Sequence, residues 1–271
     1  MSFLIKRIFR RIAIFLVFAL IVGGASYLIF GGNIPETCSD GVKNQNETDI
    51  DCGGSCRSCV DIADLLVFDT RAIPTKDGFV DLFAEIQNKN LNHGIATLGY
   101  RFDIIDRDNQ IITSKEGFTF VLPNSKKFII DEAIAVNRNV KETRLSFTTP
   151  IVWQRTPDTY TRPQIITLSK TYKILTQEEP GFAKLQGIVS NRDNFDFEQV
   201  NILAVIRDNI RNLPIAVAKQ PINTLLVNQN RAYKIIWFHR IPSFSLENIE
   251  IIAETNIFDN ANYLKPIEIE Q

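Results

Sequence analysis

The most evident chemistry in this sequence belongs to four cysteines gathered in one short segment. Cys38, Cys52, Cys56 and Cys59 are the only cysteines in the chain. Outside the cytoplasm such thiols oxidise, and a polar segment too short to bury a core is stabilised by disulfides. We therefore expect two disulfides, and the sequence leaves all three pairings open. Zinc ligation and a redox CxxC pair fit less well, because Cys38 is distant and no βαβ pattern surrounds the pair.

Oxygen-bearing side chains crowd the same segment. Gly41, Gly53 and Gly54 allow tight turns between them. Calcium prefers carboxylate and carbonyl oxygens, so the segment is a candidate calcium site, although its spacing does not match an EF-hand loop. A solvated, turn-rich acidic loop explains the same residues without a metal, and no other cofactor is expected. The candidate calcium ligands are Asp40, Asn44, Asn46, Glu47, Asp49 and Asp51.

No arrangement of side chains in the rest of the sequence predicts catalysis. The chain has two histidines, His93 in an expected loop and His239 in an apolar strand, and neither has a partner at motif spacing. The motifs of serine hydrolases, zinc proteases and P-loop enzymes do not occur. Asp106, Asp108 and Asp208 follow strands, where aspartate commonly caps a hairpin turn. We therefore expect a protein that is not an enzyme.

Two aromatic residues, Trp153 and Tyr160, lie in a proline- and threonine-rich stretch. Exposed aromatic rings stack on sugars or anchor a protein partner. Packing between two domains explains the same residues, and both interpretations stay open at this point.

An uncharged, apolar run precedes the cysteine segment. Ile12–Phe30 spans roughly 29 Å as a helix, which matches the hydrocarbon core of a bilayer. The basic residues just before the run predict a cytoplasmic N-terminus, with everything after the run outside the plasma membrane. Gly23 and Ala25 also fit a cleaved signal peptide, but Tyr27–Phe30 extends the apolar run past them. These basic residues are Lys6, Arg7, Arg10 and Arg11.

The charge balance of the exported part argues against nucleic acid as a partner. Without the four N-terminal cations, the chain carries 26 basic and 31 acidic residues. A mildly acidic protein lacks the basic surface that phosphate backbones require. The expected partners are the membrane and either another envelope protein or a glycan.

Two parts of the sequence repeat each other in the phase of their apolar residues. Gly78–Asn88 aligns without gaps on Gly181–Asn191, an offset of 103 residues. The next strand repeats at an offset of 102, where residues 98–104 correspond to residues 200–206. Alternating apolar residues with frequent turns predict antiparallel strands that bury one face. We expect an all-β fold of two tandem immunoglobulin-like sandwiches of about 100 residues each.

A stretch rich in proline and threonine separates the two copies and predicts a short, fairly stiff linker. The predicted organisation is a cytoplasmic segment (1–11), a transmembrane helix (12–30), a disulfide-rich segment (31–60), a first sandwich (61–149), a linker (150–163) and a second sandwich (164–271).

Two short motifs resemble known families. Phe102-Asp103-Ile104-Ile105-Asp106, with the preceding Asn88, resembles the signature of FxLYD domains. The second copy keeps Asn191, the spacing and Asp208. This resemblance implies immunoglobulin-like sandwiches in an exported or membrane-anchored prokaryotic protein, and sandwiches of the water-stress type are similar. Residues 38–59 resemble a cysteine module of exported multidomain proteins, with the pattern CxDGxKNxxETxxDCGGxCxxC.

These observations predict a membrane-anchored, exported protein with a binding or structural role in the cell envelope. One alternative is an enzyme or enzyme subunit that acts on wall polymers or exported proteins through acidic loop residues. The other is a structural subunit of a larger membrane complex, in which the transmembrane helix packs through Gly23 and Gly24.

Overall fold

The computed structural model describes residues 11, 16, 17, 20, 38, 41–44, 46–56, 59, 62–76, 78–157 and 160–264. The predicted transmembrane helix lies almost entirely outside these residues. Among the residues that are described, no helix is long and apolar enough to cross a bilayer. The chain divides into two compact units, Met1–Asp61 and Ile62–Gln271, and each is described by itself.

The first unit contains the cysteine segment, whose cysteines form two disulfides as predicted. The structure selects one of the three pairings and joins Cys38 to Cys56 and Cys52 to Cys59. Gly54 has a φ of 58°, and a Cβ there would lie 2.3 Å from the carbonyl oxygen of Asn46. The tight turn next to the disulfides therefore requires glycine at this position.

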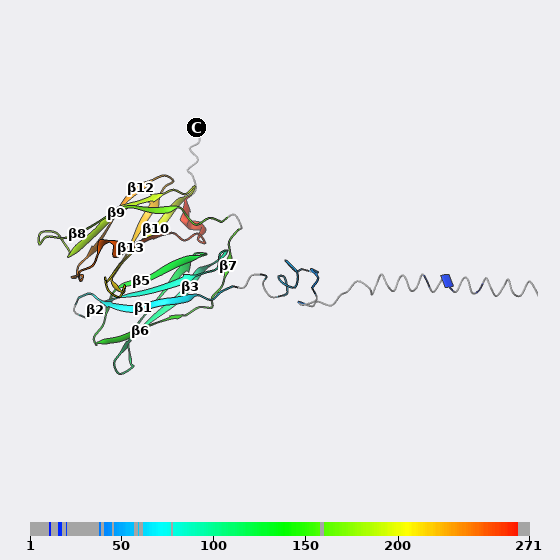
Figure 1. Ribbon diagram of the computed structural model, residues 1–271, viewed down its shortest axis with the longest axis horizontal. Helices are drawn as coiled ribbons and strands as arrows, with labels where there is room; N and C mark the ends of the chain where they lie inside the picture. The colour runs from blue at the N-terminus through cyan, green and yellow to red at the C-terminus, as the bar shows by residue number, and fades with distance from the viewer. Residues whose placement is uncertain are drawn as a thin grey trace, which may run out of the picture. The chain divides into compact units, whose positions relative to one another are not determined.

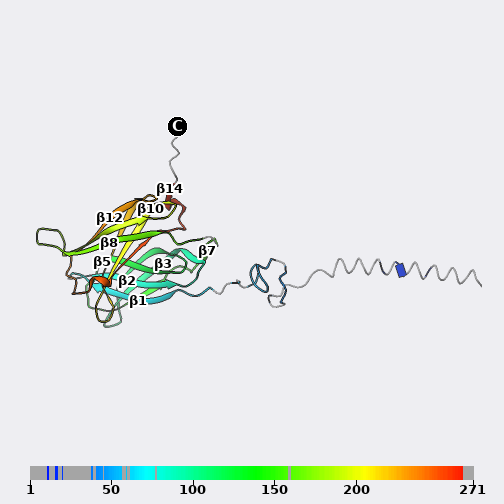
Figure 2. The ribbon, with the colours of Figure 1, turned by 45° about the horizontal axis from the view of Figure 1, so that its top comes forward.

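The second unit consists of antiparallel strands in four sheets, which confirms the all-β prediction (Figures 1 and 2). In the first sandwich, one sheet has the order β1-β2-β5 and the other the order β4-β3-β6, with β7 also paired to β3. The strands are β1 (Leu66–Pro74), β2 (Phe79–Asn88), β3 (His93–Asp106), β4 (Ile111–Val121), β5 (Ser125–Ala135), β6 (Val140–Phe147) and β7 (Gln154–Arg155).

The second sandwich repeats this topology strand for strand. One sheet has the order β12-β9-β8 and the other the order β11-β10-β13, with β14 also paired to β10. The elements are β8 (Ile165–Ile174), β9 (Ala183–Asn191), β10 (Asp196–Arg207), β11 (Pro214–Leu225), β12 (Asn230–Trp237), β13 (Ile249–Glu254) and β14 (Tyr263–Leu264), with short 3-10 helices η1 (Leu246–Asn248) and η2 (Asn260–Asn262).

The two aligned segments occupy equivalent places, as the repeat predicted. Gly78–Asn88 supplies β2 and Gly181–Asn191 supplies β9, and each is the central strand of its sheet. Two separate apolar cores contain alternate residues of these segments, and Leu82 and Leu185 are fully buried in them. These residues are Val80, Leu82, Ala84 and Ile86 in the first segment and Ala183, Leu185 and Val189 in the second. The phase of the apolar residues therefore determined which face of each strand is buried.

An asparagine at the end of the central strand makes the same hydrogen bonds in both copies. The Asn88 Nδ2 donates to the carbonyl oxygens of His93, at 2.7 Å, and Leu122, at 2.9 Å. The Asn191 Nδ2 donates to those of Phe195, at 2.7 Å, and Leu225, at 3.0 Å. Both asparagines are fully buried, so each satisfies two carbonyl groups that water cannot reach.

A third apolar cluster joins the two sandwiches. Residues on the outer face of β1-β2-β5 pack against residues on the outer face of β11-β10-β13, and Figures 1 and 2 show the first of these sheets beside β10. The central strands are therefore apolar on both faces, as in β10, where Leu203 to Ile206 are all buried. The cluster contains Ile73, Phe83, Phe128, Ile130, Leu203, Val205 and Val217.

The two sandwiches carry different kinds of side chain at positions equivalent to those of the third cluster. Leu203 and Val205 lie at the interface, whereas the positions 102 residues earlier carry Arg101 and Asp103. Arg101 and Asp103 form a partly exposed ion pair at 2.7 Å. The same sheet position is therefore apolar where it meets the other sandwich and charged where it faces solvent.

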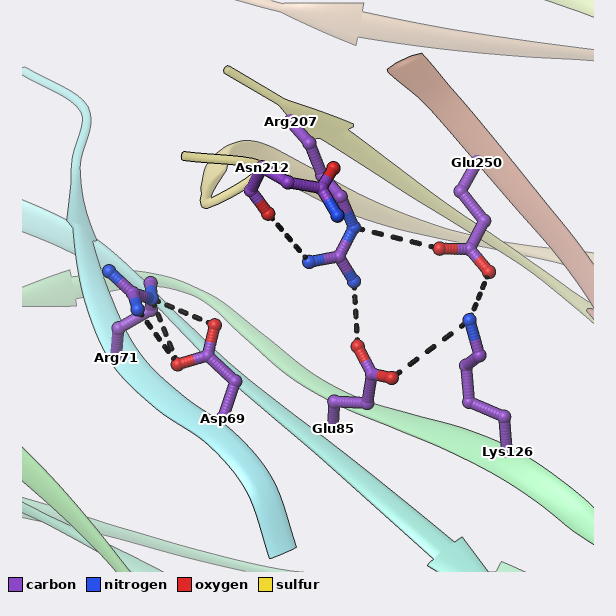
Figure 3. A network of polar contacts seen from close by, with 7 residues as sticks. All are labelled: Asp69, Arg71, Glu85, Lys126, Arg207, Asn212 and Glu250. Atoms are coloured by element: carbon purple, nitrogen blue, oxygen red, sulfur yellow. Dashed lines mark hydrogen bonds and ion pairs between the residues drawn. The ribbon is translucent and has the colours of Figure 1, made fainter. Parts of the chain in front are cut away.

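Four charged side chains close a ring at the rim of this interface (Figure 3). Arg207 lies 2.6 Å from Glu85 and 3.7 Å from Glu250, while Lys126 lies 2.6 Å from Glu250 and 3.9 Å from Glu85. Glu85 and Lys126 belong to the first sandwich, and the other two belong to the second. Exposed ion pairs contribute little to stability. Arg207 is only 12% exposed, so its ion pairs help to select the orientation in which the two sandwiches pack.

The predicted linker is tied to the first sandwich at its start. β7 lies within residues 150–163, and His93 and Gly94 of β3 pair with it. The amide of Thr156 also donates to the carbonyl oxygen of Asn92 at 2.8 Å. The first half of the stretch therefore extends a sheet.

The interface predicts a strong asymmetry between equivalent positions. We expect Val205→Asp to lower the free energy of unfolding by about 3–5 kcal/mol, because it buries a carboxylate without a partner. The matched variant Asp103→Asn should change it by less than about 1 kcal/mol, because its position is partly exposed. Urea unfolding followed by tryptophan fluorescence measures both, and equal stabilities would contradict this interface.

Candidate functional site

The acidic residues of the cysteine segment cap the backbone of their own turns. Both carboxylate oxygens of Asp51 accept from the amide of Gly41 at 3.0 Å. Glu47 accepts from the amide of Asn44 at 3.1 Å, and the Asn46 side chain from that of Ser55 at 3.4 Å. Asp49 accepts from the amide of Ile50 at 2.8 Å.

These bonds bear on the calcium prediction. Within the described part of the chain, no group of three or more histidine, cysteine or acidic residues could hold a metal ion. Asp40, one of the predicted ligands, lies outside the described residues. The turn-rich loop accounts for the described oxygens, and the calcium site stays a prediction.

The aspartates that follow the signature strands stabilise turns. Asp106 accepts from the amides of Asp108 and Gln110, both at 2.9 Å, and from Arg138 at 2.9 Å. Asp208 accepts from three amides of its own turn, at 2.7–2.9 Å. These hydrogen bonds hold the pKa of both carboxyl groups below the ordinary value. Both aspartates remain ionised caps, the structural role that their positions predicted.

The histidines lie apart from these aspartates. His93 was expected in a loop, but it is buried at the start of β3 because β7 pairs with it there. His239 lies just beyond β12, and burial lowers its pKa although the Asp81 carboxylate opposes this. Neither histidine forms part of a nucleophile and base pair among the described residues.

Sequence reasoning missed one place where two carboxyl groups with raised pKa values lie close together. Burial raises the pKa of Asp81, which also accepts from the amide of Ala133 at 2.8 Å. Burial and the Asp81 carboxylate raise the pKa of Glu132 to about 7. A hydrogen bond from the backbone amide of Lys219, which belongs to the second sandwich, opposes this shift, and so does the charge of the same residue. Asp81 and Glu132 lie about 50 residues apart in the sequence, so no spacing pattern could predict that they meet.

This acidic pair predicts how stability depends on pH. A carboxyl group with a raised pKa holds its proton in the folded state at pH values where the unfolded chain has released it, so stability falls as pH rises through that window. We expect unfolding free energy to decrease between pH 4.5 and about 7. The variant Glu132→Gln should flatten that slope, while Glu178→Gln on an exposed loop should not. Identical slopes in urea titrations would contradict the assignment.

One candidate binding site is an aromatic pocket of about 470 Å³ in the second unit. The linker, the turn between β9 and β10, and the C-terminal segment around η2 supply its walls. Four aromatic side chains line it beside polar groups. They are Tyr160, Phe195, Phe258 and Tyr263, and a fifth aromatic lining residue, Phe197, is almost fully buried.

The buried asparagine of the second copy positions two residues of this pocket. Its side chain donates to the carbonyl oxygen of Phe195 at 2.7 Å and accepts from the amide of Asp193 at 2.9 Å. Phe195 is 56% exposed and meets Tyr263 nearly edge-on, with ring centroids 5.4 Å apart. An exposed ring held by its neighbour and by its backbone is a rigid stacking platform.

Tyr160 contributes an unsatisfied polar atom. Its hydroxyl is shielded from solvent and has no hydrogen-bond partner among the described residues. Burial raises its pKa to about 12, although the charge of Arg162 opposes this, and Tyr263 and Asp193 add to the rise. A buried hydroxyl without a partner costs about 1–3 kcal/mol, so a ligand that bonds it would recover this energy.

Asp193 is the carboxylate of the pocket. One of its oxygens accepts from the amide of Gln164 at 3.1 Å, and the other accepts from the amide of Asn194 at 2.7 Å. Each oxygen keeps capacity for a further hydrogen bond. The pocket therefore combines flat apolar rings with a donor and acceptors at fixed positions.

The two aromatic residues singled out from the sequence have different roles. Trp153 packs partly buried against the core of the first sandwich, while Tyr160 lies in the pocket. Sequence reasoning missed Phe195 and Tyr263, which lie about 70 residues apart. A signal was present in Phe195, which is an apolar residue directly after the polar run Asn191–Asn194.

No protein-family model matches the chain, and no curated protein sequence matches it.

Proposed function

We propose that this chain is a membrane-anchored, exported protein that binds a glycan without modifying it. The observation that carries the proposal is the buried, unpartnered hydroxyl of Tyr160 inside an aromatic pocket. The uncharged run Ile12–Phe30 and the basic cluster before it support the anchor. The similarity to FxLYD domains belongs to the same proposal.

A sugar fits this pocket better than a purely apolar ligand. One face of a pyranose ring is rich in C–H groups and packs on an aromatic ring such as that of Phe195. Its hydroxyl groups both donate and accept, so they can satisfy the Tyr160 hydroxyl and the Asp193 oxygens together. An apolar ligand would desolvate the same atoms without bonding them, which costs free energy.

Binding without turnover is the chemistry that the described side chains support. Hydrolysis of a glycoside uses two carboxyl groups that flank the scissile bond. Asp193 is the one carboxylate among the described residues that line the pocket. The shifted pair Asp81 and Glu132 lines the interface instead, beside Lys219.

Two substitutions test the pocket. Tyr160→Phe should weaken glycan binding about threefold to tenfold, because one hydrogen bond is lost, and should leave stability unchanged or higher. Phe195→Ala should weaken it by a similar factor through loss of stacking. A glycan array of N-acetylglucosamine oligomers and neutral glucans first selects the oligosaccharide that binds most tightly. Calorimetry then measures its affinity for each variant.

The matched control is Phe118→Ala, because Phe118 is an exposed ring on β4, outside this pocket. Unchanged binding in all three variants would locate any glycan site elsewhere. Release of reducing sugar by the wild-type chain would contradict the assignment as a binding protein.

The anchor has its own test. The full chain should stay in the membrane fraction after an alkaline wash, and protease added outside intact cells should remove the C-terminal domains but spare an N-terminal tag. A variant without residues 1–30 should not sediment with membranes. Loss of the N-terminal tag to external protease would reverse the proposed topology.

A further inference from the structure

The first sandwich has an open groove of about 960 Å³ along one side. It lies between the edge strands β1 and β6, which belong to opposite sheets. Ala72 and Val140 form part of its floor, where they pack against the core of the sandwich. The groove is separate from the aromatic pocket and shares no lining residue with it.

The duplicated architecture provides an internal comparison for this groove. In the second sandwich, the equivalent edges belong to β8 and β13. There the Lys170 Nζ donates to the carbonyl oxygen of Ile249 at 2.6 Å and ties the two edges together. The fully buried ring of Tyr233 fills the space beside them, and a cavity of about 340 Å³ remains.

The strand pairing shows which residues of the first sandwich occupy the positions of Lys170 and Ile249. Lys170 pairs with Gly187, and Thr70 pairs with Ala84, which lies 103 residues before Gly187. Ile249 pairs with Ile206, and Thr143 pairs with Ile104, which lies 102 residues before Ile206. Thr70 and Thr143 therefore occupy the positions of Lys170 and Ile249, and a threonine is too short to tie the edges together.

Thr143 also carries an unsatisfied group. Its Oγ1 is shielded from solvent and has no hydrogen-bond partner among the described residues, and Thr143 lines the groove. Buried hydroxyl groups without partners are rare in folded proteins. A ligand in the groove that offers a hydrogen bond would satisfy this atom.

The charge of the groove is opposite to that of the exported chain. Its described lining residues include Lys76 in the β1–β2 turn, Arg107 in the β3–β4 turn, Arg138 in the β5–β6 turn and Lys141 in β6. Glu142 is the one carboxylate among them. Arg138 pairs with Asp106, and the Lys141 Nζ donates to Asn109, so both side chains are held at that end. Arg71, which also lines the groove, pairs with Asp69 outside it at 3.0 Å.

Both walls offer backbone hydrogen-bonding groups. Within the described part of the chain, β1 pairs with β2 on one side and β6 pairs with β3 on one side, so each strand has a free edge. A free edge next to an apolar floor is the arrangement by which extended peptides add to a sheet.

We propose that this groove binds an extended, acidic segment of a partner polypeptide, which adds as a strand along β1. Apolar side chains on one face of the segment cover Ala72 and Val140, and acidic side chains on the other face meet the cations. A polyphosphate would satisfy the cations but would leave the apolar floor and the free edges unused. This partner is additional to the proposed glycan.

The test uses the full chain in detergent micelles and a nine-residue peptide, as long as β1, that alternates glutamate with valine. Wild type should bind it more tightly than a peptide that alternates glutamine with valine, and binding should slow amide hydrogen exchange in β1. Thr70→Lys should weaken binding at least about tenfold, because the new ammonium group can tie the edges as Lys170 does. The size-matched Thr70→Val should retain binding.

Thr70→Lys adds a positive charge as well as closing the groove. Closure of the groove predicts weaker peptide binding, whereas simple attraction to a basic surface predicts tighter binding. Tighter binding by this variant would show attraction to a basic surface alone and would overturn the groove. Arg107→Glu supplies a second variant at the turn, and loss of binding there is expected if the cations recognise the acidic side chains. Equal affinity for inorganic polyphosphate, or no detectable peptide binding at about 1 mM, would overturn the proposal. Far-ultraviolet circular dichroism and urea unfolding of each variant report whether it is folded.

Discussion

The contact between the outer faces of β1-β2-β5 and β11-β10-β13 is the interaction on which the second unit depends. It buries large apolar side chains such as Phe83, Phe128 and Val205 from both sandwiches. The hydrophobic effect at this contact makes one body of two sandwiches that each already have a core. The charged ring around Arg207 then selects an orientation, because each of its members has a partner from the other sandwich (Figure 3).

The aromatic pocket is a consequence of this contact. A Cβ at Gly94 would lie 2.5 Å from the Phe258 ring, so the C-terminal segment of the second sandwich packs directly on β3 of the first. The linker is fixed to the same strand through β7. Because two of its three walls are attached to β3, the pocket can keep a hydroxyl buried without a partner, which a looser arrangement would expose to water.

The two sandwiches share their strand order and their buried polar hydrogen bonds, and they differ in the side chains at the interface, the sheet edges and the aromatic pocket. The buried asparagines make equivalent hydrogen bonds, and the aspartates cap equivalent turns. On that framework Arg101 faces solvent where Leu203 meets the other sandwich, and Thr70 leaves open the edge that Lys170 closes. His93 is buried where the second copy presents Phe195 to the aromatic pocket. A framework held by buried polar bonds tolerates these exchanges, because the exchanged side chains lie outside the two apolar cores inside the sandwiches.

The sequence by itself determined the strands, their inward faces and the duplication. Alternation of apolar residues along Gly78–Asn88 and Gly181–Asn191 leaves one register that buries them, and four cysteines in a short polar segment predict two disulfides. It also indicated Tyr160 as a candidate binding residue.

Only the tertiary structure decided the cysteine pairing, the contact between sandwiches, and the meeting of Tyr160 with Phe195 and Tyr263. The physical reason is that periodicity reports which face of a strand is buried, a local property. Which distant surface covers an outer face depends on shape and charge summed over both sandwiches.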